Sequence, residues 1–287
     1  MPELPEIETT VRELRKKVLK RTFLDVWTDC PKIIKKPNDF KQFKSIITGK
    51  EIKSVYRKGK NIIFSLSADF SLLIHQKLTG HLLYGKWKKQ GLIWKPVVAG
   101  PIASDPMNRF IHLIFLFDNK WQLALCDLRK FSKVVLAKNE EIKEETETIG
   151  PDPLLMTFGK FKKIIGQKNA KIKQVLMDQK LISGIGNIYS NEALFEARIN
   201  PKRPASDLKE GEIKRLYHSL TKILKKSISV QGESFSDFRT LDGKKGGFDV
   251  FIKVYRKEGK KCPYCGGKIV KEEIGGRSSY FCPNCQK

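Results

Sequence analysis

Residues 176–192 read LMDQKLISGIGNIYSNE, and this stretch predicts two helices joined by a tight, glycine-dependent connection. Apolar side chains recur at helical spacing over residues 170–180 and again over residues 187–197. Between the two helices, Gly184 and Gly186 permit backbone conformations that end one helix and start the next. We therefore expect this junction to lie within a helical domain.

The flanking sequence extends the helical region in both directions. Residues 158–166 and 209–230 also show helical periodicity, which gives a predicted helical domain over residues 154–231. Upstream, residues 139–153 (NEEIKEETETIGPDP) form an acidic stretch that ends in glycine and prolines. We interpret this stretch as a solvated linker.

The region before the linker, residues 1–138, is predicted to form one domain of a different kind. Residues 3–20 have the apolar spacing of an amphipathic helix. Short strands are predicted over residues 61–67, 71–76, 109–117 and 121–126. Because no long helices separate these strands, an antiparallel β-sandwich or barrel is expected. The segment 87–108, rich in glycine and proline, is expected to be a long loop.

The C-terminal region, residues 232–287, contains a polar Gly- and Ser-rich segment and a cysteine-rich module. The segment, residues 232–247, is predicted to be a mobile loop. In the module, two Cys-x-x-Cys pairs are separated by sixteen residues: Cys262, Cys265, Cys282 and Cys285. This spacing predicts a structural zinc site with four thiolate ligands. Two redox dithiols are the alternative, but they normally require a thioredoxin-like βαβ unit, which the sequence does not predict.

The overall charge favours one kind of partner without excluding a membrane surface or a merely soluble lysine-rich protein. The chain has 287 residues, with 56 Lys and Arg against 31 Asp and Glu, for a net charge of +25. Such an excess favours nucleic acid as partner, with an anionic membrane surface as the second candidate. No signal peptide, membrane span or basic amphipathic helix with an aromatic face is predicted. Isolated Cys30 and Cys126 are interpreted as free thiols in a reducing cytoplasm.

The N-terminus, MPELPE, carries a second chemical signal. Pro2 and the acidic residues Glu3 and Glu6 are typical of a helix start, where carboxylates face the positive end of the helix. Removal of Met1, however, would make Pro2 a secondary amine with a pKa of about 8. Such an amine condenses with a sugar aldehyde to an iminium ion, as lysine amines do in Schiff-base enzymes.

Together, these motifs resemble the formamidopyrimidine-DNA glycosylase and endonuclease VIII family. The resemblance rests on residues 2–6 (PELPE), residues 176–192 and the terminal cysteine module, which occur in the family's order and span the chain. It implies an α+β multidomain protein with three parts. These are an N-terminal antiparallel β-sandwich with a flanking helix, a helix–two-turn–helix domain and a C-terminal four-cysteine zinc finger.

The resemblance also implies roles for individual residues. Pro2 would be the nucleophile at C1′ of the damaged nucleotide, and Glu3 the general acid/base, with Glu6 supporting it. Three further matched positions would contact the DNA backbone: Lys60 in RKGKNIIF, Asn187 in the helix–two-turn–helix and Arg277 in the zinc finger. Lys60 and Arg277 also belong to the implied catalytic set.

Two further sequence segments match the residues that fill the gap left by an extruded nucleotide. These are Leu78 in HQKLTGH, and Arg129 and Phe131 in DLRKF. Phe131 would wedge between bases and Arg129 would donate to the orphaned base. A core aromatic at Phe131 and a strand-face side chain at Leu78 are the plain alternatives. The sequence departs from the family where Leu78 replaces the usual methionine and DLRKF the common DPRRF.

The implied function is base-excision repair of double-stranded DNA. The Arg-x-Phe pattern and residues 232–247, which resemble a loop that covers oxidised purines, favour the formamidopyrimidine branch. We therefore expect 8-oxoguanine and formamidopyrimidines as substrates, a Pro2 Schiff base, β,δ-elimination and one structural zinc ion. A bacterial, nucleoid-associated monomer without membrane contact is expected. The alternatives are an endonuclease VIII-like enzyme for oxidised pyrimidines and a non-catalytic zinc-ribbon DNA-binding protein.

Overall fold

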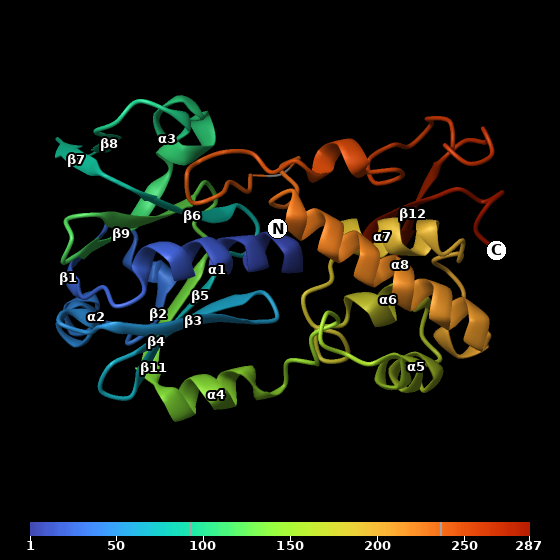
Figure 1. Ribbon diagram of the computed structural model, residues 1–287, viewed down its shortest axis with the longest axis horizontal. Coiled ribbons are helices and arrows are strands. Elements are labelled where there is room, and N and C mark those ends of the chain that lie inside the picture. The colour runs from blue at the N-terminus through green and yellow to red at the C-terminus, as the bar shows by residue number, and fades with distance from the viewer. Residues whose placement is uncertain (92, 236) are drawn as a thin grey trace. The chain divides into compact units, whose positions relative to one another are not determined.

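The computed structural model describes residues 1–91, 93–235 and 237–287, and the chain divides into two units (Figure 1). The first unit contains residues Met1–Glu147 and Val230–Gly247, and the second contains Thr148–Ser229 and Phe248–Lys287. This division differs from the four consecutive segments predicted from the sequence. Residues 230–247 belong with the N-terminal unit, whereas the prediction grouped residues 232–247 with the zinc finger.

The first unit is built on an antiparallel β-sandwich of two sheets. One sheet has the order β1-β9-β10-β6 and the other the order β2-β11-β5-β4-β3, with only the β2–β11 pair parallel. The bounds are β1 Phe23–Thr28, β2 Ile34–Lys36, β3 Ile52–Lys58, β4 Asn61–Leu66, β5 Phe70–His75, β6 Gly80–Gly85, β9 Ile111–Phe117, β10 Gln122–Asp127 and β11 Lys133–Lys138. The strands predicted from the sequence therefore form, with ends within about two residues.

Alternation along the strands places one face of each sheet in a shared core. In β4, Ile62 and Phe64 point inward, and in β9, Leu113 and Phe115 do the same. Because strand side chains alternate between faces, this core contains every second residue of the central strands. The sandwich therefore supplies a rigid scaffold for the loops at its ends.

Helix α1 (Leu4–Val18) flanks the sandwich and packs mainly on β3. Its apolar side chains Ile7, Val11 and Leu14 recur at helical spacing and join the sandwich core. Helix α2 (Phe40–Ile47) contributes Phe43 and Ile47 to the same core. A short 3₁₀ turn, η1 (Pro31–Ile33), precedes β2. The helix predicted over residues 3–20 is thus present.

The segment 87–108, which we predicted to be a long loop, forms secondary structure, so this prediction is wrong. The expected loop 87–108 contains a hairpin, β7 (Trp87–Gln90) and β8 (Ile93–Pro96), and two short helical turns, α3 (Pro101–Ser104) and η2 (Pro106–Arg109). Trp94 of this hairpin meets Trp27 edge-on at 5.4 Å, and this burial of aromatic surface orders the hairpin. Leu92 lies outside the described residues.

The expected linker 139–153 begins with a helix, α4 (Asn139–Glu147). Its buried side chains Ile142 and Thr146 lie one turn apart, and Ile142 packs on the outer face of the five-stranded sheet. Ion pairs join Glu141 to Lys36 and Glu145 to Lys133. The acidic residues therefore pair with lysines of the first unit, so residues 139–147 belong to that unit and are not a linker, whereas the boundary between the two units falls directly after Glu147.

The second unit contains the predicted helices and the cysteine module. Its helices are α5 (Phe158–Gly166), α6 (Ile172–Met177), α7 (Asn187–Glu196) and α8 (Glu210–Ser229). The 3₁₀ turn η3 (Ala205–Asp207) precedes α8, and η4 (Phe248–Phe251) begins the chain that leads to the hairpin of β12 (Val270–Ile274) and β13 (Arg277–Phe281). Strand β13 packs on α7, so the hairpin is attached to the helical domain.

Candidate nucleic-acid site

The N-terminal residues are held at the start of α1 by their own side chains. Glu3 is the N-cap, is only 3% exposed, and forms a capping box with Glu6. The backbone N–H of Glu3 donates to Oε2 of Glu6 at 2.8 Å. Pro2 is buried next to it, and Pro5 has the fixed φ that suits a first helical turn. The two residues predicted to carry the chemistry therefore lie in one rigid segment.

Glu6 also contacts the segment that returns to this unit from far along the chain. Its Oε1 accepts the backbone N–H of Glu233 at 2.9 Å. Next to it, Gly232 has a φ of +86°, and a Cβ there would lie 3.0 Å from Cγ and Oε1 of Glu6. Both the backbone conformation and the close approach of Glu6 therefore favour glycine at this position. The sequence predicted Glu6 as a supporting residue without identifying this contact.

Lys60 lies in the turn between β3 and β4 and is half-buried. The preceding Gly59 has a φ of +57°, which lets the chain turn tightly. Burial first, and then the charges of Lys77 and Lys60, lower the pKa of His75 to about 3. His75 is therefore neutral at physiological pH, and the positive charge in this region comes from the lysines.

The two loops that contain Leu78, Arg129 and Phe131 are joined by one buried carboxylate. Asp127, 1% exposed, accepts the hydroxyl of Thr79 and both the N–H and the hydroxyl of Ser132, the latter two at 2.7 Å. Burial alone would raise the pKa of Asp127, but these hydrogen bonds lower it overall. Asp127 therefore stays ionised and fixes both loops to each other.

The three side chains on these loops are available for contact. Phe131 is 50% exposed, so the alternative that it is a core aromatic is wrong. The guanidinium of exposed Arg129 lies 4.7 Å from the centre of the Phe131 ring. Leu78 is half-buried and lies between β5 and β6, not on a strand face. An exposed aromatic next to an exposed arginine suits insertion into stacked bases.

In the second unit, Asn187 is the first residue of α7 and reaches the zinc-finger hairpin. Its Nδ2 donates to the carbonyl oxygen of Ser278 at 3.0 Å. The same carbonyl accepts from Nζ of Lys173, at 3.2 Å, and Lys173 also donates to Oδ1 of Asn191 at 3.0 Å. Ser278 directly follows Arg277, so these bonds position the strand that presents the exposed arginine.

Sequence reasoning missed two buried charged residues of this network. Lys173 is fully buried, and its only sequence signal is a lysine inside the apolar helix IKQVLM. Glu192 accepts three backbone N–H groups, from Lys253, Val254 and Tyr255, at 2.8 to 2.9 Å. Burial nevertheless raises the pKa of Glu192. Both residues act as internal braces between α7 and the C-terminal segment.

The four C-terminal cysteines come together as predicted. Their sulfur atoms all lie within 4.8 Å of one another, with Cys262–Cys285 at 3.8 Å and Cys265–Cys282 at 3.5 Å. Zinc bound by four thiolates at about 2.3 Å places the sulfurs about 3.8 Å apart. The residues present therefore fit a tetrahedral zinc ion with a closed coordination sphere. Cys30 and Cys126 are buried, free and remote from this cluster in sequence.

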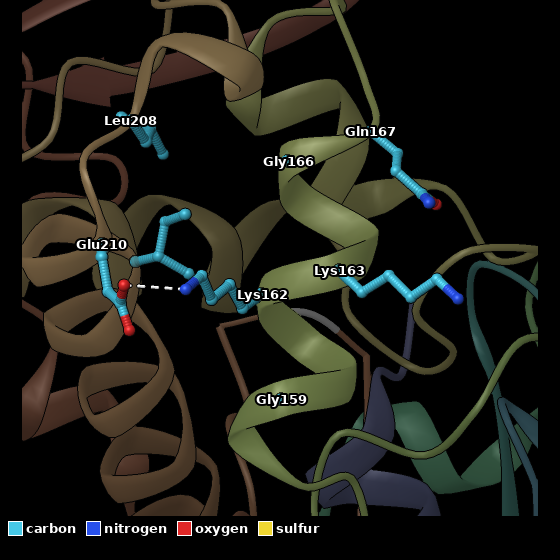
Figure 2. Close-up of a pocket in the computed structure, with 8 residues that line it drawn as sticks. Gly159, Lys162, Lys163, Gly166, Gln167, Leu208 and Glu210 are labelled. Atoms are coloured by element: carbon cyan, nitrogen blue, oxygen red, sulfur yellow. Dashed lines mark hydrogen bonds and ion pairs between the residues drawn. The ribbon is translucent and has the colours of Figure 1, made fainter.

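A cavity of about 410 Å³ lies between α5 and the start of α8 (Figure 2). Figure 2 shows Lys162 extended from α5 towards Glu210, with which it forms an ion pair at 2.7 Å. Leu208 and Ile213 make the wall apolar. None of the predicted site residues lines this cavity, so we do not assign the chemistry to it.

Comparison with known proteins tests these assignments. The formamidopyrimidine-DNA glycosylase N-terminal domain matches residues 1–134, and the H2TH domain of the same enzymes matches residues 149–239. The zinc finger found in FPG and IleRS matches residues 259–287. A relative from Pelotomaculum thermopropionicum, named formamidopyrimidine-DNA glycosylase, is 40% identical, with 100% of this chain and 99% of the relative covered. The chain belongs to the formamidopyrimidine-DNA glycosylase family.

Other members of the family support this assignment. A relative from Desulforamulus reducens with the same name is 34% identical and covers 100% of this chain and 99% of its own length. Wild-type Lactococcus lactis Fpg (MutM), solved with DNA containing N7-benzyl-Fapy-dG, superposes with a TM-score of 0.85 at 32% identity and complete coverage of both chains. The same protein with abasic-site DNA gives 0.84 at 31% identity and 99% coverage of both chains.

Membership in this family confirms the α+β fold and the enzyme class. The chain is a DNA glycosylase with a β-sandwich, an H2TH helical domain and a four-cysteine zinc finger. Among the described residues, none of the helices combines the length and the apolar character needed to cross a bilayer.

Proposed function

We propose that this glycosylase removes 8-oxoguanine and formamidopyrimidines from double-stranded DNA and then cleaves the strand at the abasic site. The observation that carries the proposal is the placement of Pro2 and Glu3 in one rigid segment at the N-terminus of α1. The Arg129-x-Phe131 pattern and the anchored segment 230–247 favour oxidised purines over oxidised pyrimidines.

The proposed chemistry begins with the nitrogen of Pro2. After removal of Met1, this nitrogen is a secondary amine with a pKa of about 8, so part of it is neutral at physiological pH. It attacks C1′, the glycosidic bond breaks, and the base leaves with the bonding electrons and takes up the proton that the Pro2 nitrogen releases. Glu3 protonates the ring oxygen as the sugar opens, which leaves an iminium ion between Pro2 and C1′.

Strand cleavage follows from the acidity that this iminium gives to the C2′ proton. Loss of that proton expels the 3′ phosphate in β-elimination, and a second proton loss expels the 5′ phosphate in δ-elimination. Hydrolysis of the remaining iminium frees Pro2 for another turnover. All of these steps use groups of the chain, the sugar and water.

DNA must be opened before this chemistry, because C1′ is inaccessible in a stacked duplex. Phe131 wedges into the stack, Arg129 donates to the orphaned base and Leu78 fills the remaining space. Lys60, Asn187 and Arg277 contact the DNA backbone. The four cysteines would hold one zinc ion, which would fix the hairpin that presents Arg277. The protein acts as a monomer at the bacterial nucleoid.

Borohydride trapping tests the proposal directly. The protein without Met1 is mixed with an 8-oxoguanine duplex and borohydride, and a covalent protein–DNA adduct is expected. Pro2→Gly should weaken the adduct, and an N-terminal tag that keeps Pro2 as an amide should abolish it. A duplex with thymine glycol serves as the comparison substrate. No adduct with any lesion would overturn the enzymatic mechanism, and preference for thymine glycol would overturn the substrate class.

A further inference from the structure

A second carboxylate of α1, that of Glu13, contacts the same returning segment as Glu6. Glu13 lies two helical turns after Glu6, and residues at this spacing share one face of a helix. It is half-buried, whereas the neighbouring Arg12 and Lys16 are exposed. Glu13 is not among the residues that the proposed chemistry uses.

Each oxygen of the Glu13 carboxylate holds a different end of one stretch of chain. Oε1 accepts from Nε2 of Gln231 at 3.1 Å, and Oε2 accepts from the backbone N–H of Leu241 at 2.8 Å. One side chain thus bridges two positions that are ten residues apart. The adjoining residue Asp242 is tied to α1 as well, through an ion pair with Lys17 at 2.8 Å.

The bond to Leu241 matters most because that residue is fully buried. Its carbonyl oxygen accepts from the backbone N–H of Tyr84 at 2.8 Å, so the backbone of Leu241 is fixed on both sides. A buried N–H that loses its acceptor is costly, and the chain around it rearranges to find another. The carboxylate of Glu13 is the acceptor for this N–H.

Residues between these anchors make further contacts within the first unit. Arg239 forms an ion pair with Asp105 at 2.6 Å, and the hydroxyl of Ser234 donates to the carbonyl of Phe238 at 3.0 Å. The described parts of the segment, residues 231–235 and 237–241, are therefore bonded within the first unit, and residues at both ends contact Glu13, whereas Ser236 lies outside the described residues. The prediction of a mobile loop did not anticipate these anchors.

We propose that Glu13 is a positioning residue for base recognition, which sets the distance between Gln231 and Leu241 and so the shape of the segment that holds the damaged base. This inference rests on the proposed function, in which residues 232–247 cover an oxidised purine. The inference predicts that Glu13 affects excision of a damaged base but not cleavage of an abasic site. An abasic site has no base for the segment to hold, so its cleavage does not depend on Glu13.

The test compares two single-turnover rates for each variant. One is base excision from an 8-oxoguanine duplex, and the other is cleavage of a preformed abasic site in the same sequence. Glu13→Ala removes both hydrogen bonds, and loss of the acceptor for the buried Leu241 amide should slow base excision about ten-fold and leave abasic-site cleavage within about two-fold. Glu13→Gln keeps one acceptor oxygen for Leu241, so it should restore most of the excision rate.

Glu8→Gln is the matched control on the same helix. Glu8 forms ion pairs with Arg12 at 2.8 Å and Arg57 at 2.9 Å, and neither pair involves the described part of residues 231–241. Its loss should lower stability without changing the ratio of the two rates. Hydrogen exchange of the Leu241 amide supplies a second readout, and it should accelerate in Glu13→Ala but not in the control.

The outcomes separate this inference from the proposed function. If Glu13→Ala slows both rates equally, or neither, the positioning role is wrong while the wild-type activity stands. Unchanged exchange of the Leu241 amide would also contradict it. If the wild-type protein without Met1 processes neither duplex, the proposed function fails instead.

Discussion

Glu6 accepts the backbone N–H of Glu233 at 2.9 Å, although 227 positions separate the two residues in the sequence. Its second oxygen holds the N–H of Glu3 at 2.8 Å. Because the carboxylate is buried, neither donor has water as an easy substitute. Glu6 therefore connects the N-terminal residues that we assign to the chemistry with the segment that we assign to base recognition.

Glu6→Gln should disturb both ends of this connection. A glutamine offers one acceptor oxygen, so its NH₂ group must face one of the two N–H donors. We expect the free energy of unfolding to fall by about 1–3 kcal/mol, the cost of a buried unsatisfied donor. Denaturant unfolding measures this loss, and the exposed carboxylate change Glu144→Gln is the control. Equal stability of Glu6→Gln and wild type would show that Glu6 is not a shared anchor.

Asp127 gives a pH-dependent prediction. Its hydrogen bonds lower the folded-state pKa below the unfolded value of about 3.9, so the carboxylate stabilises the fold above that pH. This contribution is lost as the pH falls through the folded-state pKa. Asp127→Asn should therefore cost about 2–3 kcal/mol at pH 7, and less as the pH drops below 4. Urea unfolding at several pH values checks this, and a cost independent of pH would contradict it.

The repeating elements of this fold were predictable because they have local signals. The helices α5, α7 and α8 and the strands β4, β5, β9 and β10 show the apolar spacing of their type, and they form where predicted. The cysteine pairs also define their cluster through spacing alone. The hairpin β7–β8 was missed because its order comes from Trp94 meeting Trp27, a contact between residues distant in sequence.

The site was less predictable than the fold because its buried residues depend on partners that are distant in the sequence. Pro2, Glu3, Asn187 and Arg277 are proposed as site residues on the basis of motifs, not of any property visible in isolation. Buried Lys173 and Asp127 could not be recognised, because a buried charge requires partners from several separate segments. Helix α4 was mistaken for a linker because its acidic side chains pair with lysines that the sequence does not place beside them.

Loss of one cysteine ligand should lower the amount of zinc that the cysteine module binds. The sulfur geometry fits four thiolate ligands, so we expect one zinc ion per chain in the purified protein. Cys265→Ser removes one ligand and should lower both the zinc content and the affinity for duplex DNA, because the hairpin bearing Arg277 loses its support. Cys30→Ala changes a cysteine outside the cluster and should retain full zinc content. Elemental analysis decides between these outcomes, and zinc retained in Cys265→Ser would contradict the four-ligand site.

Substitution of Phe131 should change the rate of base excision while leaving the free energy of unfolding nearly unchanged. Because its ring is half exposed, Phe131→Ala should change the free energy of unfolding by no more than about 0.5 kcal/mol. Loss of the wedge should nevertheless slow excision from a duplex about 10- to 100-fold, since unstacking costs a few kcal/mol. Leu128→Ala, an equally exposed apolar residue in the same loop, should leave the rate near wild type. The same lesion in single-stranded DNA has no base pair to break and is not held in a duplex stack, so the difference between Phe131→Ala and wild type should shrink there. A defect of equal size on both substrates would mean that Phe131 acts on the base or sugar and not as a wedge.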